Sequence, residues 1–193
     1  MLDNKPDKIE KSKDSIARFN HWDERNKRVT YGLGLVIVMS LGIPVWFLSI
    51  FILVGNGIAY LKLFLVVPAA ISTVLIHELV HYMFHWVFSK KRPILGFKRP
   101  FPYSKLRENS SISRNQGIVS ALSPLIIITV VCVLLAIKGS PMTQLIFILT
   151  AYFHATICSG DIVSTNRLLK YPKDTRLRVE GDETVIFREL NME

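Results

Sequence analysis

The sequence predicts an all-α polytopic membrane protein with about four transmembrane helices, a short cytoplasmic β-like loop and a C-terminal hairpin. Half of its 193 residues are hydrophobic, and they are concentrated in blocks rather than spread with the period of a surface helix. Two of these blocks contain no charged residue over more than 20 positions. The lysines and arginines gather between the blocks in alternating numbers, which is typical of chains that cross a bilayer repeatedly.

Four apolar blocks are long enough to cross a hydrocarbon core about 30 Å thick. They are Tyr31 to Val54, Ala59 to Phe88, Gly117 to Ile137 and Met142 to Val163. The first and third are uncharged, the second has Lys62 near its start, and the fourth is interrupted only by His154 and Asp161. Pro44 and Pro68 are expected to bend the first two helices, which membrane helices tolerate when neighbouring groups satisfy the freed carbonyls.

The basic residues predict the orientation of these spans. In chain order, eight lysines and arginines lie in residues 1–30, one (Lys62) follows the first block, eight lie in residues 89–115, one (Lys138) follows the third block, and six lie from Arg167 onward. The positive-inside rule then places both termini and the central loop in the cytoplasm, with the chain in the cell membrane. The net charge of +9 is explained by topology, and no nucleic-acid partner is expected because the charges flank helices instead of forming one stripe.

The predicted organisation has three parts. Residues 1–30 form a cytoplasmic tail. The first apolar block is too long for the hydrophobic region of a signal peptide and has no small-residue cleavage pattern after it, so it should remain as an anchor. Residues 31–165 form a four-span membrane domain with a cytoplasmic loop at 89–115. Residues 166–193 form a cytoplasmic tail with the hairpin, in which residues 176–179 and 184–187 flank a Glu-Gly-Asp-Glu turn.

Two further features of the chain bear on its fold. Residues 93–104 contain too many prolines for a helix and are expected to form an irregular or edge-strand segment. The two cysteines, Cys132 and Cys158, both fall inside predicted spans without a C-x-x-C spacing. We therefore expect no disulfide.

The sequence His77-Glu-Leu-Val-His81 lies within the second apolar block. On a helix this H-E-x-x-H pattern places two imidazoles one turn apart, separated by about 6 Å of rise. Both can reach one metal ion, and the intervening Glu78 stands beside the open coordination position. The pattern thus predicts a zinc site with Glu78 as the general base.

Ionisable residues are rare in the apolar blocks, and most of those present are acids and histidines, the residue types that bind metal ions. Of fifteen acidic residues only Glu78 and Asp161 lie there, together with four of the five histidines. Such groups are costly in lipid unless they face a partner or a water-filled cavity. Catalytic zinc takes three protein ligands and leaves one position for water, so His77, His81 and Asp161 would complete a site. The alternative for Asp161 is a helix-capping role after Ser159-Gly160.

Three other residues have open roles. His154, Cys158 and Asp161 are spaced at 0, 4 and 7, on one helical face, so His154 is a candidate to orient a ligand or to donate to an oxyanion. A simple interhelical hydrogen bond is an equal alternative. Cys158 is expected to be a packing residue. His85 lies eight residues after His77, not at the offset of ten found in metzincins, and an interfacial histidine near Trp86 is favoured.

These residues resemble the site-2 protease class of intramembrane metalloproteases. The likeness rests on His77-Glu-Leu-Val-His81, on the Ser-Ala-Leu-Ser-Pro sequence at 120–124, and on Ser159-Gly160-Asp161. The chain is more closely similar, over about residues 60–190, to small bacterial membrane proteins described as zincin peptidases. In site-2 proteases the ligand aspartate lies in a longer motif ending Leu-Asp-Gly, whereas here Gly160 precedes the aspartate and Ile162 follows it.

The resulting functional hypothesis is a zinc-dependent intramembrane or juxtamembrane peptidase that acts on a membrane-protein or peptide substrate. Residues 93–104 are expected to hold the substrate as an added strand. Two alternatives remain: a non-catalytic metal-binding membrane scaffold or regulator, and a membrane zinc hydrolase of a non-peptide bond. Glu78 argues against the scaffold, because a structural site needs no acid between its ligands.

Overall fold

The computed structural model describes residues 15–20, 24–56, 66–98, 101–108, 110–181 and 183–188. Five helices fall in these ranges: α1 (Glu24–Asn56), α2 (Val66–Ser89), α3 (Arg114–Lys138), α4 (Pro141–Ile157) and α5 (Ser159–Leu168). Six strands accompany them: β1 (Ser15–Asn20), β2 (Ile94–Lys98), β3 (Phe101–Lys105), β4 (Ser111–Ser113), β5 (Thr175–Glu180) and β6 (Glu183–Arg188). The protein is mostly helical, and the all-α expectation was too narrow.

Among the described residues, three helices are long and apolar enough to cross a membrane, and a fourth span results if α4 and α5 count as one. The qualifying stretches in α1, α2 and α3 are Lys27–Phe47, Val67–Ser89 and Arg114–Lys138. In α1 none of this stretch is buried within the protein, so its apolar side chains require lipid or another partner to cover them. The predicted start of the second span, at Ala59 with Lys62, lies outside the described residues.

Prolines affect the helices in different ways because of where they lie. Pro44 is inside α1, as expected. Pro68 falls in the first turn of α2, where no intrahelical donor is lost, so it marks the start of this helix instead of bending it. Pro124 lies inside α3 and leaves one carbonyl without its usual partner, which proves important for the site.

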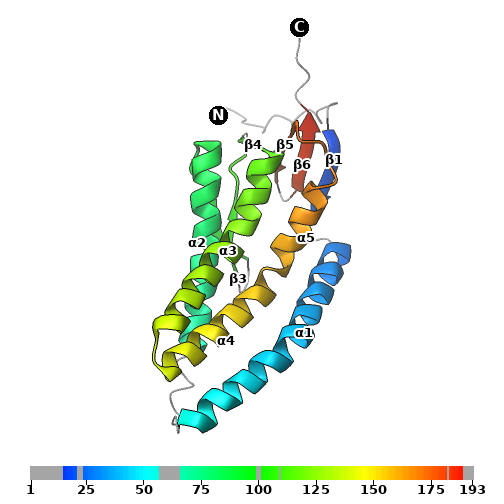
Figure 1. Cartoon of the computed structure of the whole chain (residues 1–193). Helices are drawn as coiled ribbons and strands as arrows, with labels where there is room; N and C mark the ends of the chain where they lie inside the picture. The colour runs from blue at the N-terminus through cyan, green and yellow to red at the C-terminus, as the bar shows by residue number, and fades with distance from the viewer. Residues whose placement is uncertain are drawn as a thin grey trace.

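The predicted fourth span is not one continuous helix. It breaks at Cys158 into α4 and α5, which meet at an angle of 44°. The helices run side by side, with α1 packed on α4 and α2 packed on both α3 and α4 (Figure 1). The break therefore lies against the middle of the bundle, and α5 begins with Asp161 in its first turn.

A four-stranded antiparallel sheet, in the order β1-β6-β5-β4, lies at the end of the helices where α3 begins and α5 ends (Figure 1). The pairing of β5 with β6 confirms the C-terminal hairpin, with Leu177 opposite Ile186. β1 comes from the predicted N-terminal tail and pairs with β6. One face of the sheet packs on the helices through a core of Leu106, Ile112, Leu168, Leu177 and Ile186.

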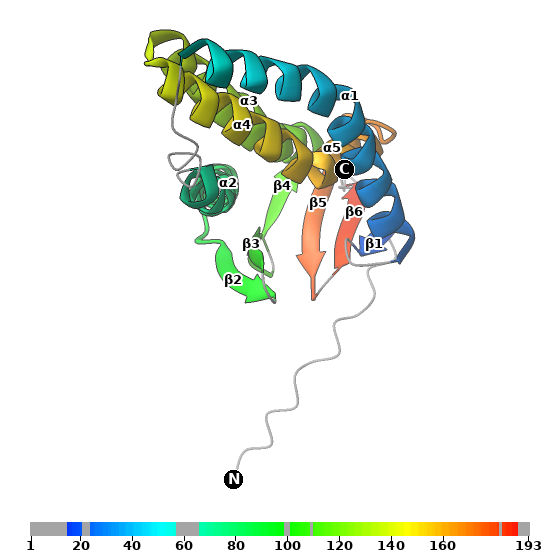
Figure 2. The ribbon, with the colours of Figure 1, turned by 90° about the horizontal axis from the view of Figure 1, so that it is seen from below.

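The proline-rich loop forms a second sheet, the β2-β3 hairpin, which lies beside α2 and apart from β5 and β6 (Figure 2). Gly96 lies opposite Tyr103, and a Cβ on Gly96 would stand 2.8 Å from the Tyr103 hydroxyl. Glycine at this position thus lets the tyrosine ring lie across the strand. The proline-rich segment was expected to be irregular or an edge strand, and its described residues form two paired strands.

Candidate metal centre

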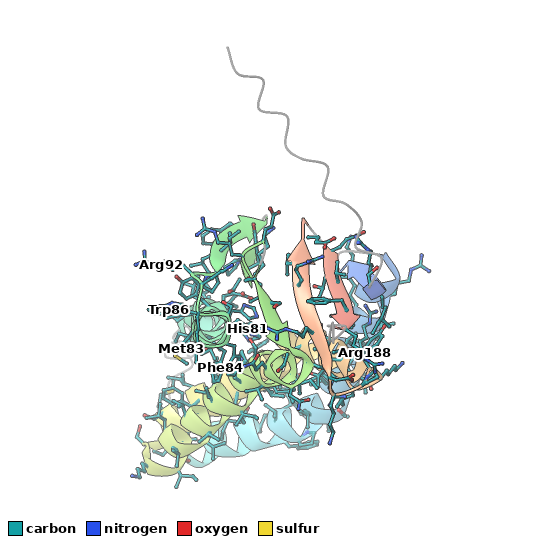
Figure 3. The ribbon with its side chains drawn as sticks, turned by 90° about the horizontal axis from the view of Figure 1, so that it is seen from above. His81, Met83, Phe84, Trp86, Arg92 and Arg188 are labelled. Carbon is teal, nitrogen blue, oxygen red and sulfur yellow. The ribbon has the colours of Figure 1, made fainter. Side chains whose placement is uncertain are left out.

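Helix α2 presents its two ligand candidates to the interior. His77 and His81 are 4% and 9% exposed, and their ring centroids lie 4.6 Å apart. His81 points from α2 toward the other helices, whereas Met83 and Trp86, about half exposed, point away from them (Figure 3). The four-residue spacing has this effect because one turn of helix returns to the same face.

Asp161 reaches this pair of histidines from α5. Its Oδ2 lies 3.3 Å from Nε2 of His77, and its Oδ1 lies 3.3 Å from Nε2 of His81. The two Nε2 atoms are 3.1 Å apart. The capping alternative does not describe this residue, because Cys158 is the N-cap of α5 and makes no side-chain cap bond. The helix break thus turns the Asp161 carboxylate toward α2.

A freed backbone carbonyl orients His81. Proline has no N–H, so Pro124 cannot donate to the carbonyl of Ser120 four residues earlier in α3. That oxygen instead accepts from Nδ1 of His81 at 2.9 Å and from the Ser123 hydroxyl at 2.9 Å. Since a carbonyl can only accept, Nδ1 of His81 carries the proton and Nε2 presents its lone pair to the site.

A side chain orients His77. Its Nδ1 lies 3.1 Å from Nε2 of His154 on α4, and His154 is completely buried. The sulfur of Cys158 lies 3.7 Å from the same Nδ1. When His77 donates from Nδ1 to His154, its Nε2 also presents a lone pair to Asp161 and His81.

These contacts fit a metal ion. Two bare imidazole nitrogens 3.1 Å apart repel each other in a buried place unless a cation lies between them. Ligand atoms of a tetrahedral zinc, at about 2.0 to 2.2 Å from the ion, lie roughly 3.3 to 3.6 Å from one another. The separations of 3.1, 3.3 and 3.3 Å among the donors of His77, His81 and Asp161 are close to this. The three residues are thus able to hold one divalent ion.

Glu78 stands beside this donor set rather than inside it. Its Oε1 is 4.0 Å from Nε2 of His77, and its carboxylate lies close to the backbone of Ser104 on β3. It also lines a groove of about 250 Å³ between α2 and the β2-β3 hairpin, whose other lining residues are apolar: Leu75, Ile76, Leu79, Leu95, Phe97 and Pro102. The carboxylate thus lies where the donor set of His77, His81 and Asp161 meets an apolar groove.

His85 is not among the donors that converge on this centre. Its ring stacks on His81 with centroids 6.1 Å apart, and its Nδ1 lies 3.4 Å from the Ser104 hydroxyl. His85 therefore joins α2 to the β2-β3 hairpin. The sequence reasoning did not anticipate the role of Pro124, although the Ser-Ala-Leu-Ser-Pro sequence contained the signal: a proline inside an apolar helix always leaves a carbonyl four residues earlier without its helical donor.

Comparison with known proteins supports the zincin interpretation. Residues 69–176 match the family described as "Putative zincin peptidase". This region contains the H-E-x-x-H helix, the hairpin, α3 and the α4–α5 break with Asp161. No curated protein and no solved structure matches the chain. The match covers more than half of the 193 residues, and the chain therefore belongs to the "Putative zincin peptidase" family.

Proposed function

We propose that this chain is a zinc-dependent peptidase that hydrolyses peptide bonds within or beside the membrane. The proposal is supported above all by one arrangement: His77, His81 and Asp161 converge on one point, and Glu78 stands next to them at the groove. The convergence of donors from α2 and α5 supplies three ligands, as catalytic zinc sites require. The position of Glu78 outside the donor set supplies a base with access to substrate.

Each residue then has one task. Zinc, when bound, would polarise the scissile carbonyl and make a water acidic near neutral pH. Glu78 takes a proton from that water and passes it to the leaving amine. The Ser120 carbonyl and His154 hold the two ligand histidines in the tautomer that binds metal.

The groove favours an extended, apolar peptide segment as substrate. Its walls are leucine, isoleucine, phenylalanine and proline side chains on α2, β2 and β3. In the described residues, β2 and β3 pair only with each other, so each has an outer edge, and unpaired backbone groups are costly at membrane depth. A substrate strand added to the hairpin would satisfy such groups and pass Glu78. The resemblance to site-2 proteases agrees with a membrane-protein substrate.

The activity test uses purified protein in detergent or lipid discs and a single-span peptide with helix-breaking residues near its cytoplasmic end. Glu78→Gln should retain about one zinc per chain and lose turnover, because a base is removed but no ligand. The matched control is Glu108→Gln, in an exposed loop residue, which should retain both. Turnover in Glu78→Gln, or its absence in the wild type loaded with zinc, would contradict the proposal, and the second result would favour a metal-binding scaffold.

A second experiment tests the kind of bond that is cut. Helices hide their carbonyls in hydrogen bonds, so a substrate with Gly, Pro or Asn near the scissile bond should be cut faster than its all-Leu counterpart. Mass spectrometry of the products locates the cuts. Equal rates for both substrates, or cuts only in soluble unfolded proteins, would contradict a membrane substrate.

We further propose that both termini and the loop at 89–115 face the cytoplasm, as the distribution of lysine and arginine predicts. Reporter fusions after Glu193 and within 104–114 should then report a cytoplasmic position, and fusions near Asn56 and Ser140 an external one. An external C-terminus would contradict this orientation.

A further inference from the structure

A second set of converging metal donors lies on the opposite side of the His77 ring. It consists of Nδ1 of His77, Nε2 of His154 and Sγ of Cys158. The three residues are 4%, 0% and 0% exposed. This sulfur triad shares His77 with the first donor set but uses the other ring nitrogen.

The separations within the sulfur triad are those of one face of a tetrahedral site. The two nitrogens are 3.1 Å apart, and the sulfur lies 3.7 Å from the His77 nitrogen and 3.4 Å from the His154 nitrogen. Zinc bonds of about 2.0 Å to nitrogen and 2.3 Å to sulfur place their ligands roughly 3.3 to 3.6 Å apart. The donor–donor separations of the sulfur triad, like those of the first donor set, are thus close to the separations between ligands of a tetrahedral zinc.

We propose that the sulfur triad is a second metal site, which binds a soft divalent cation and fastens the α4–α5 break to α2. A donor set of one thiolate and two imidazoles suits Zn²⁺, Cd²⁺ or Co²⁺ rather than Mg²⁺ or Ca²⁺. His154 lies in the last turn of α4, Cys158 lies at the break, and His77 lies on α2. One ion held by all three would therefore fix the bend that presents Asp161 to the first donor set.

The charges balance in this buried place. Binding releases two protons, one from the Cys158 thiol and one from Nδ1 of His77, because ligands bind metal in their deprotonated form. The thiolate, the bridging His77 imidazolate and the carboxylates of Asp161 and Glu78 then carry four negative charges, which balance the two divalent cations that His77 joins. His154 contributes a neutral lone pair. A neutral cluster avoids the large cost of burying a net charge.

Cobalt titration of the full chain tests this proposal independently of any hydrolysis. The metal-free protein is held in detergent with a phosphine reductant, so that the reductant adds no thiol that could bind cobalt, and it is equilibrated at each addition. The first donor set contains no sulfur, so the first equivalent of Co²⁺ should give ligand-field bands alone. The second equivalent should add a thiolate-to-cobalt charge-transfer band and raise the unfolding midpoint by several degrees.

The two cysteines provide a matched pair of variants. Cys158→Ser should abolish the charge-transfer band, bind one equivalent and lose the second rise in the unfolding midpoint. Cys132→Ser removes the other buried thiol, on α3, and should behave as wild type. Asp161→Ala should weaken the first site and retain the thiolate band, which shows that the two sites are separate.

Two outcomes would overturn the inference. Saturation of the wild type at one equivalent without a thiolate band would mean that His154 and Cys158 only hydrogen-bond to His77. A thiolate band that develops with the first equivalent and no second binding event would mean that one ion uses Cys158 in a single site. If the wild type hydrolyses substrate in either case, only the second metal site is contradicted and the proposed peptidase function is not. If the wild type binds two cobalt ions but hydrolyses no substrate, only the peptidase function is contradicted.

Discussion

Two neighbouring histidines of α2 are oriented in different ways. His81 is oriented where α2 contacts α3, and His77 where α2 contacts α4. His81 binds a backbone carbonyl that Pro124 leaves free, whereas His77 binds the side chain of His154. The backbone support depends on the absence of an N–H and survives most changes of side chain. The side-chain support is lost with one substitution. The orientation of His81 should therefore tolerate most side-chain substitutions, whereas the orientation of His77 depends on one side chain.

The largest expected effect comes from removing a donor rather than its support. Asp161→Ala removes the only carboxylate that lies within 3.3 Å of both Nε2 atoms in the described structure. Zinc affinity should fall by more than about 100-fold, beyond what the loss of a supporting partner causes. Competition with a chromophoric chelator measures this. Asp174→Ala, an exposed partner of Arg188, is the control, and an unchanged affinity in Asp161→Ala would exclude this residue as a ligand.

The side-chain support should have the next largest effect. His154→Leu leaves Nδ1 of His77 without its nitrogen acceptor, and zinc affinity should fall by about 10 to 100-fold. His154→Gln offers an amide oxygen at a similar reach and should restore part of this loss. An equal loss in both variants, measured by the same chelator competition, would show that His154 acts through packing and not through its acceptor.

The backbone support should be weaker but equally specific. Pro124→Ala restores an N–H that competes with His81 for the Ser120 carbonyl, so zinc affinity should fall by up to about 10-fold. The helix itself should gain stability, because alanine is the better helix former. Pro44→Ala restores an N–H in α1, a helix that carries none of the donors, and should leave zinc affinity unchanged. If both variants bind zinc like the wild type, the freed carbonyl does not orient His81.

The sequence anticipated the parts of this protein that depend on local pattern. The apolar blocks, the C-terminal hairpin and the grouping of His77, Glu78 and His81 follow from hydropathy and from one turn of helix. The break at Cys158 was not anticipated, because a bend at Ser159-Gly160 depends on packing against other helices. The pairing of β1 with β6 joins residues more than 160 positions apart, and no local pattern indicates such a contact.

The smallest expected effect is where α1 meets α4, through a hydrogen bond that involves none of the metal donors. The Tyr152 hydroxyl donates to the carbonyl of Val38 at 3.1 Å, and a Cβ on Gly42 would lie 3.0 Å from this hydroxyl. Tyr152→Phe should lower the free energy of unfolding by about 0.5 to 1.5 kcal/mol, the usual net value of one hydrogen bond, and leave zinc affinity unchanged. Tyr31→Phe, at a residue that is 72% exposed, should change neither quantity. Denaturant unfolding in detergent and chelator competition measure the two effects, and a loss of zinc affinity in Tyr152→Phe as large as in His154→Leu would mean that α1 is coupled to the metal centre.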